Sequence, residues 1–351
     1  MPSLLINLIF FLFICWIVNR VPINKNKKDN IIVVFACFQV IFFQTFKDIN
    51  SLPDILGYVR AWNYICEDNS TWFGATYYYK MQYGYFLYNK LLSYISHEPL
   101  FFTFATGCII SLPYIFIIKK YSPIIWFSLV LYMMSFTQST FVLRQYTSIA
   151  LCIIAFPLLF KHEYIKSVVL WLIAISIHPT AVFGGITFVL YFIRSNKWFI
   201  IGCVILFAVL VRSLPLLMVM FTDNVDGYNY YLGIEGVDYS TVVLNLFYAV
   251  TFYYFVIMKR DVTEEESLMM KMSVITFIIP LAAIFTGTSV VVPRLIMYMT
   301  FVQFIIIPKT LQAIKKRFLK VCLGGIYFFL NYYLFMISDK TRAIDFRLIF
   351  E

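Results

Sequence analysis

Three strongly apolar stretches of this chain each carry polar residues that suit anion binding or proton transfer. Arg144 and Gln145 stand in TFVLRQYTSIALCIIAF, His178 stands in ISIHPTAVF, and Arg294 stands in VVPRLIMYM. Two guanidinium groups offer forked N–H donors to phosphate oxygens. A histidine titrates near neutral pH and can therefore accept or release a proton. A charge at mid-membrane costs at least ~2.5–3.5 kcal/mol, so such residues require a function or a compensating environment.

Composition indicates that a lipid bilayer surrounds these stretches. The chain has 351 residues, of which 62% are hydrophobic and 13% are charged, whereas soluble domains carry about 25% charged residues. Apolar runs of about 15–20 residues, the length that crosses a hydrocarbon core of ~30 Å, recur from end to end. No internal repeat or linker divides them. We therefore predict an all-α polytopic membrane protein with a single integral domain over residues 1–351.

The apolar runs predict about twelve transmembrane helices. The first run lacks a basic start and an A-x-A cleavage site, so we expect a retained span rather than a signal peptide. One alternate set of loops holds 18 of the 28 Lys and Arg residues, which places that set in the cytoplasm. The predicted spans are roughly 4–18, 31–46, 100–118, 123–138, 140–160, 167–177, 180–193, 198–221, 242–258, 272–288, 293–308 and 321–337.

Two long loops, about 47–99 and 222–241, are predicted to face outward. Within the first, the segment 82–97 is expected to be re-entrant or amphipathic at the interface rather than to cross. Both loops are dense in Tyr, Asp and Asn. An aromatic belt at the membrane boundary explains part of this composition. The remainder suits a carbohydrate, whose C–H faces stack on aromatic rings and whose hydroxyls bond to amides and carboxylates.

The charge distribution and the cysteine positions argue against a nucleic-acid partner, a disulfide framework and a metal cluster. The formal net charge is +10, but the basic residues cluster in short loops, where they set topology, so we expect no nucleic acid. Of seven cysteines, only Cys66 lies outside an apolar run. We therefore expect neither a disulfide framework nor a metal cluster.

The isolated polar residues are predicted to share one depth. Counted along their spans from Lys161, Lys166 and Lys309 at ~1.5 Å per residue, Arg144, His178 and Arg294 lie roughly 25, 18 and 22 Å above the inner boundary. Irregular backbone at that depth, as expected around His178, needs cover from protein or from a water-filled cavity.

Simpler explanations exist for each of these residues. In these explanations, Arg144 would only extend its side chain to the outer boundary, and Arg294 would only anchor a span at the interface. His178 would be a turn histidine whose hydrogen bonds are satisfied. Arg212 lies deeper and either lines the cavity or pairs with an acidic neighbour. Against these alternatives, two arginines at one depth suit a diphosphate, and the outer boundary suits one that is linked to a lipid.

Five short motifs resemble those of the EpsG/Wzy-like bacterial polysaccharide polymerases. LRQYTSIALCIIAF and ISIHPTAVF resemble an R-Q-x-x-[AS] helix and the later histidine with a small or hydroxyl residue nearby. PDILGY and KMQYGYFLYNKLL resemble an outward Asp-x-x-x-Tyr element and an acidic-x-Gly-[FY] segment, and VVPRLIMYM resembles a late arginine at a span start. The chain departs at Gln82, where an acidic residue is usual, and in the DFRLIF tail, which lacks a Pro-Tyr ending.

The resemblance implies a plan like that of the lipid-phosphate-dependent (GT-C-like) glycosyltransferases. It implies an O-antigen, capsule or exopolysaccharide polymerase of the bacterial inner membrane, with its active site on the periplasmic face. Such an enzyme transfers a growing glycan from undecaprenyl diphosphate to a sugar hydroxyl of a second lipid-linked repeat unit. No cofactor and no metal are implied. The implied partners are the two lipid-linked substrates, membrane lipid, a Wzz-like chain-length co-polymerase and a flippase.

This chemistry assigns a role to each candidate residue. Arg144 and Arg294 stabilise the departing diphosphate, and Gln145 orients it. His178 or Asp54 removes the proton of the acceptor hydroxyl, with His178 slightly favoured. Tyr58, Gln82 and Tyr85 are expected to contact sugar.

Two other functions fit part of the pattern. A flippase or transporter would share the many spans and the basic cavity, but it would need polar lining towards both sides, and this chain shows no two-fold repeat. A membrane O-acyltransferase would use a histidine as base, but no companion Asn or Asp motif accompanies His178. These alternatives are therefore ranked below the polymerase.

Overall fold

The structure, a computed structural model, is helical throughout the part of the chain that it describes. That part comprises residues 2–50, 52, 54–194, 199, 201–203, 205–213, 239–258, 262–286, 292–341 and 348–349. Its one β feature is an isolated bridge between Lys47 and Leu348. The prediction of an all-α protein is confirmed. In chain order the elements are α1 (Pro2–Arg20), α2 (Lys25–Thr45), α3 (Ile55–Cys66), α4 (Trp72–Tyr79), α5 (Tyr83–Ser93), α6 (Pro99–Tyr121), α7 (Ile125–Ser135), η1 (Phe136–Thr140), α8 (Leu143–Leu159), α9 (Tyr164–Ile177), η2 (Pro179–Gly185), α10 (Ile186–Phe192), α13 (Tyr239–Phe252), η3 (Tyr253–Ile257), α14 (Glu264–Thr286), α15 (Val292–Thr300), α16 (Gln303–Ala313) and α17 (Arg317–Thr341).

Several of these helices have the length and apolarity of membrane spans. Within the described residues, α2, α6 and α14 meet both conditions, and α15 with α16 forms a fourth candidate that bends by 46°. Shorter apolar helices, among them α8 and α9, surround them. All twelve predicted ranges overlap helical residues, and residues 214–221 of the range 198–221 lie outside the described part of the chain. The chain is thus a membrane protein, while the number of twelve crossings stays a prediction.

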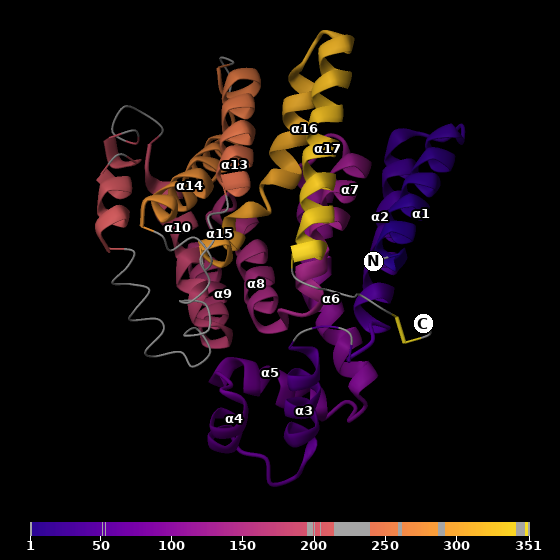
Figure 1. Ribbon diagram of the computed structural model, residues 1–351, viewed down its shortest axis with the longest axis vertical. Helices are drawn as coiled ribbons and strands as arrows, with labels where there is room; N and C mark the ends of the chain where they lie inside the picture. The colour runs from indigo at the N-terminus through magenta and orange to yellow at the C-terminus, as the bar shows by residue number, and fades with distance from the viewer. Residues whose placement is uncertain are drawn as a thin grey trace.

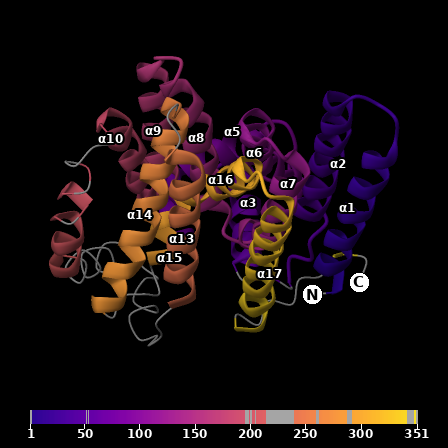
Figure 2. The ribbon, with the colours of Figure 1, turned by 90° about the horizontal axis from the view of Figure 1, so that it is seen from above.

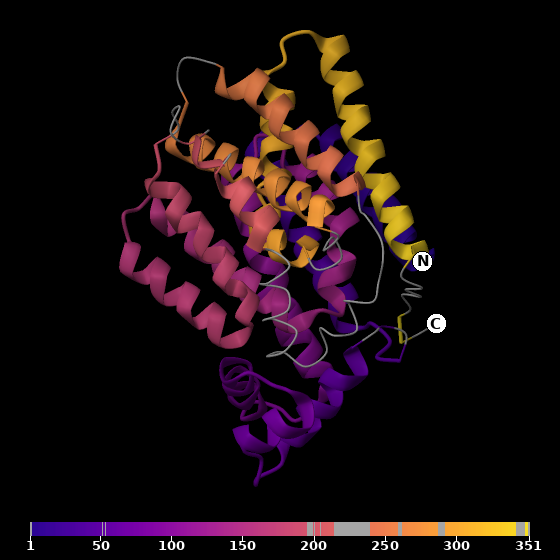
Figure 3. The ribbon, with the colours of Figure 1, turned by 60° about the vertical axis from the view of Figure 1, so that its left-hand side comes forward.

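The helices form a bundle with a small lobe at one end (Figure 1). The lobe consists of α3, α4 and α5 and is built from most of the predicted loop 47–99. Seen from the side it projects beyond the bundle (Figure 3). Seen from above, α1 and α2 lie at one edge of the bundle, and α6, α7 and α16 lie between them and α10 (Figure 2). Most of the second predicted loop, residues 222–238, lies outside the described residues.

The turns of the bundle agree with the alternation of basic and aromatic loops. The α1–α2 and α16–α17 turns lie at the end of the bundle far from the lobe (Figure 1). The basic loops 20–30 and 309–320, predicted to be cytoplasmic, contain these turns. The aromatic lobe therefore lies at the other end, as the alternation requires.

Local sequence explains why the lobe breaks into short helices. The Thr71 hydroxyl accepts the N–H of Gly74 at 3.1 Å and begins α4. Lys80 ends α4 in the left-handed region, with φ of 49°, and Asp54 precedes α3 with φ of 66°. That conformation costs a non-glycine residue about 1–2 kcal/mol. These two residues turn the chain sharply where the lobe faces the bundle.

A glycine allows the lobe to dock on α9. A Cβ built at Gly84 would lie 2.7 Å from the carbonyl carbon of Ser176 and even closer to its hydroxyl. Real Cβ atoms do not approach backbone this closely. Gly84 thus sets the distance between α5 and α9.

We expect Gly84→Ala to destabilise the protein by about 1–3 kcal/mol, because the added methyl group overpacks the α5–α9 contact. The measurement is the midpoint of thermal unfolding of detergent-purified protein. Gly325→Ala is the matched control, because nothing lies within 4 Å of a Cβ at that helical position. Equal midpoints for both variants would contradict this account of the contact.

We also expect the lobe to face the outside of the cell. Reporter fusions after Lys28, Glu163 and Glu265 should report cytoplasm, and a fusion after Asn69 in the lobe should report the opposite side, because basic loops stay in the cytoplasm. Paired alkaline phosphatase and fluorescent-protein fusions measure this directly. A cytoplasmic signal from the Asn69 fusion would reverse the assignment.

Candidate functional site

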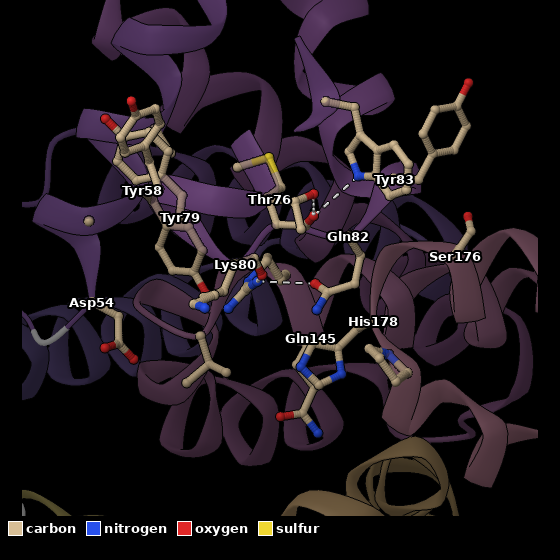
Figure 4. A pocket seen from close by; sticks show the side chains of 18 of the residues that line it. Asp54, Tyr58, Thr76, Tyr79, Lys80, Gln82, Tyr83, Gln145, Ser176 and His178 are labelled. Carbon is tan, nitrogen blue, oxygen red and sulfur yellow. Dashed lines mark hydrogen bonds between the residues drawn. The ribbon is translucent and has the colours of Figure 1, made fainter. Parts of the chain in front are cut away.

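A cavity of about 1280 Å³ lies between the lobe and the bundle. The lobe contributes residues of α3, α4, the start of α5 and the α4–α5 linker, and the bundle contributes the start of α8, the break between α9 and η2, and α15. Asp54 lies on one side of it and His178 towards the other, with Gln82 and Gln145 between them (Figure 4). The volume exceeds the ~300–1,000 Å³ that is usual for small-molecule pockets. A ligand larger than one small molecule therefore fits.

Arg144 lies in the first turn of α8 and reaches across to the lobe. Its Nη1 donates to the carbonyl oxygen of Lys80 at 2.8 Å and to Gln82 Oε1 at 3.0 Å. Its guanidinium carbon lies 5.8 Å from the ring centroid of Tyr58, within cation–π range. Its Nε is buried without a hydrogen-bond partner among the described residues. Arg144 is thus covered by the lobe, and one of its N–H donors lacks a hydrogen-bond partner there.

Gln145 connects α8 to the second arginine. Its Nε2 donates to the backbone carbonyl of Arg294 at 2.7 Å, which fixes the start of α15 against α8. Its Oε1 is buried and has no partner among the described residues. Arg144 and Arg294 both line the cavity and both interact electrostatically with His178. The structure therefore brings together three residues that the sequence placed at one depth.

His178 is the residue at which α9 ends and η2 begins. This interruption of the helix places the His178 ring at the cavity. Its Nδ1 lies 2.7 Å from Thr180 Oγ1, and that hydroxyl lies 3.0 Å from the Tyr298 hydroxyl. Tyr298 in turn lies 2.8 Å from Ser148 Oγ. A chain of hydroxyl groups thus joins η2, α15 and α8 behind the imidazole.

These hydroxyl residues were missed as site residues, although the sequence contained a signal for each. Ser148 is the last position of the R-Q-x-x-[AS] motif, and Thr180 is the hydroxyl residue near the histidine. Tyr298 follows Arg294 by four positions, so both lie on one helical face. The motifs therefore mark the hydrogen-bonded support of the site as well as its lining.

Aromatic side chains of the lobe form the opposite wall. Trp72 Nε1 and Thr76 Oγ1 both donate to the carbonyl oxygen of Met81, at 3.3 and 2.9 Å, and so hold α4 against the linker to α5. Phe73 is 78% exposed and Tyr77 76% exposed. The aromatic residues of the wall are Tyr58, Trp72, Phe73, Tyr77, Tyr78, Tyr79 and Tyr83.

Two predicted site residues do not line the cavity. Tyr85 is 1% exposed and packs edge-to-face behind Tyr58, with ring centroids 6.1 Å apart, so it supports that ring. Arg212 is exposed and lies in helical residues 205–213. The remaining predicted residues, Asp54, Tyr58, Gln82, Arg144, Gln145, His178 and Arg294, all line it. Among the described residues no group of three or more His, Cys, Asp and Glu side chains is arranged to hold a metal.

A buried lysine forms a hydrogen bond to the last residue of η1, just before the turn to α8 that precedes Arg144. Lys47 Nζ donates to the carbonyl oxygen of Thr140 at 2.6 Å and to Gln44 Oε1 at 3.3 Å. Gln44 Nε2 donates to Ser139 Oγ at 2.8 Å. Lys47 lies just beyond the end of α2 and is 1% exposed. Burial lowers the pKa of Lys47 to about 7, and the neutral amine keeps enough N–H donors for both bonds.

This pKa predicts a pH-dependent stability. Between about pH 7 and the ordinary lysine pKa of about 10.4, the unfolded chain binds a proton at Lys47 that the folded protein does not bind. The free energy of unfolding should therefore rise with pH across that window. Lys47→Met lacks this contribution to the pH dependence of stability. Between pH 7 and 10, the unfolding midpoint of the wild type should therefore rise relative to that of the variant. Parallel profiles would contradict the prediction, and Lys27→Met at an exposed position is the control.

Comparison with known proteins bears on the identity of this site. No curated protein and no solved structure matches the chain. The EpsG family, whose members are Wzy-like polysaccharide polymerases, matches residues 30–346. The match covers nearly the whole chain and contains every residue of the cavity. The resemblance that the five motifs predicted is confirmed, and the chain belongs to the EpsG family.

Proposed function

We propose that this protein polymerises a bacterial surface polysaccharide by moving a growing glycan from undecaprenyl diphosphate to a sugar hydroxyl of a second lipid-linked repeat unit. The observation that carries the proposal is the pair Arg144 and Arg294, which line one cavity beside His178. Two fixed cations facing an aromatic wall suit a ligand that is anionic at one end and a carbohydrate at the other.

The arginines act on the leaving group. As the bond between the anomeric carbon and the diphosphate breaks, negative charge grows on the diphosphate, and preorganised guanidinium donors stabilise it. The Nε of Arg144 is buried and has no hydrogen-bond partner among the described residues. Its Nη1 exchanges the neutral acceptors Lys80 O and Gln82 Oε1 for ionised phosphate oxygens, which accept stronger hydrogen bonds. Gln145 keeps Arg294 in place through its backbone bond.

The aromatic wall and the polar residues next to it hold the sugars. Tyr58 and the rings of α4 offer flat faces for stacking, and Gln82 offers an amide to hydroxyl groups. The volume of about 1280 Å³ supports a site that takes sugars of both donor and acceptor.

The reaction transfers one glycosyl group and one proton. The acceptor oxygen forms a bond to the anomeric carbon, undecaprenyl diphosphate leaves with the electron pair of the broken bond, and a base takes the hydroxyl proton. His178 and Asp54 both line the cavity and are the candidate bases.

The proposed setting is the bacterial inner membrane, with the cavity open to the periplasmic side. Helices α8 and α9 have 17 and 14 residues, or roughly 26 and 21 Å of length, which is less than the hydrocarbon core of ~30 Å. Their short length supports a site that lies below the outer boundary. The plan of about twelve crossings, the GT-C-like architecture, a Wzz-like co-polymerase and a flippase as partners belong to the same proposal.

We expect Arg144→Ala to lower turnover by ~10²–10³-fold, the usual effect of removing one donor to a developing anion. Arg144→Lys should recover only part of it, because an ammonium group lacks the planar fork. The assay is polymerisation of purified lipid-linked repeat units, with product length followed on gels. Arg60→Ala is the matched control, because Arg60 is an exposed arginine of the lobe that does not line the cavity. Full activity of Arg144→Ala would refute diphosphate binding at this residue.

A further inference from the structure

We propose that Ser148, Tyr298 and Thr180 form a one-way hydrogen-bond relay that fixes the proton of neutral His178 on Nδ1, leaving Nε2 as the base of the reaction. The inference rests on the proposed function for the role of Nε2, while the position of the proton can be tested without any activity. The three relay residues are positioning residues, because they act through the imidazole.

The direction of the relay follows from counting protons. Ser148 Oγ lies 2.7 Å from the carbonyl oxygen of Gln145, which can only accept, so the single hydroxyl proton of Ser148 is used there. At the 2.8 Å contact between Ser148 and Tyr298, the proton must therefore come from Tyr298. The backbone carbonyl thus orients the first two hydroxyl groups.

The same count continues to the imidazole. Tyr298 has given its proton to Ser148, so the 3.0 Å contact between Tyr298 and Thr180 takes its proton from Thr180. Thr180 then has no proton for His178, and the 2.7 Å contact between Thr180 Oγ1 and Nδ1 is a bond in which Nδ1–H donates. A neutral imidazole with its proton on Nδ1 carries its lone pair on Nε2.

One contact favours the opposite tautomer. The backbone N–H of Thr180 points at Nδ1 from 3.4 Å. That distance lies beyond the usual ~2.7–3.2 Å for N–H donors, whereas the hydroxyl contact is 2.7 Å. The shorter contact and the proton count agree with each other, so they decide the tautomer.

The relay also suits the charges around the ring. Arg144 on α8 and Arg294 on α15 interact with His178 and repel a positive charge on it. Diphosphate bound between them supplies compensating negative charge, so Nε2 can take the acceptor proton once the donor lipid is present. Asp54 lies across the cavity (Figure 4) and interacts electrostatically with Arg144. In this proposal the Asp54 carboxylate is a partner of Arg144, and Nε2 of His178 is the base.

The tautomer can be measured by NMR of protein labelled with ¹⁵N-histidine in lipid bilayers, because the chain has only three histidines. The signal that disappears in His178→Gln belongs to His178. We expect the wild type to show a protonated Nδ1 and a bare Nε2. In Tyr298→Phe the Thr180 hydroxyl is free to donate to Nδ1, so the proton should move to Nε2.

Ser148→Ala is the second variant, and it reverses the relay without touching Tyr298 itself. Removing the acceptor of the Tyr298 proton lets that hydroxyl donate to Thr180, whose own proton then passes to Nδ1. Tyr248→Phe is the matched control, because Tyr248 is a buried tyrosine that accepts from Asn331 on elements away from the cavity. It should leave the His178 signals unchanged.

Activity gives the second readout. A wrong tautomer removes most of a general-base contribution of ~10²–10⁴-fold, so Tyr298→Phe and Ser148→Ala should lower kcat at least ~10-fold with little change in KM for the donor lipid. Asp54→Asn leaves His178 as the base, so it should lose far less kcat than His178→Gln.

The outcomes separate the relay from the proposed function. The relay is overturned if wild-type His178 carries its proton on Nε2. It is also overturned if the tautomer is the same in the wild type, Tyr298→Phe and Ser148→Ala, even if the protein polymerises normally. A relay that behaves as expected in a protein without polymerase activity overturns the proposed function instead.

Discussion

Two guanidinium groups at one end of a bundle of apolar helices are the constraint on which this structure depends. Neither can face lipid, because a charge in hydrocarbon lacks partners. Arg144 therefore reaches the carbonyl of Lys80 and the amide of Gln82, and Arg294 is fixed through Gln145. The lobe meets this requirement, since it supplies the backbone carbonyl of Lys80 beside Arg144. Lys47 supports the same arrangement from behind, at the break before α8.

The wall that covers the charges is also the wall that suits a carbohydrate. Left-handed turns at Asp54 and Lys80 fold the lobe into short helices, and Gly84 lets α5 approach α9 closely. The lobe thus contributes its aromatic rings to the same cavity as the arginines. A cationic pocket and an aromatic wall therefore arise from one packing arrangement.

The sequence predicted more of the site than of its support. Isolated charges in apolar runs identified Arg144, His178 and Arg294, because such residues stand out against lipid-compatible sequence. The apolar runs predicted where the helices lie. They did not predict how many helices cross the membrane, because several helices are shorter than a bilayer and α15 bends against α16. Tyr58 and Tyr85 belong to two different motifs and lie on different sides of one wall, and only packing reveals which ring faces the cavity. Each relay hydroxyl had only a weak signal, a motif position for Ser148 and Thr180 and a four-residue spacing from Arg294 for Tyr298. Such signals did not distinguish these residues from the many other Ser, Thr and Tyr residues of the chain.

The two acceptors of Arg144 Nη1 both belong to the linker between α4 and α5. Any anion that recruits this nitrogen competes with the lobe for it, so ligand occupancy and lobe attachment are thermodynamically linked. A change that weakens the bonds of the linker to Arg144 strengthens anion binding, and anion binding weakens those bonds. The coupling free energy is the same in both directions. Departure of the anion gives the nitrogen back to the lobe. The lobe thus behaves as an internal competitor, which sets an upper limit on how tightly any anion is retained at Arg144.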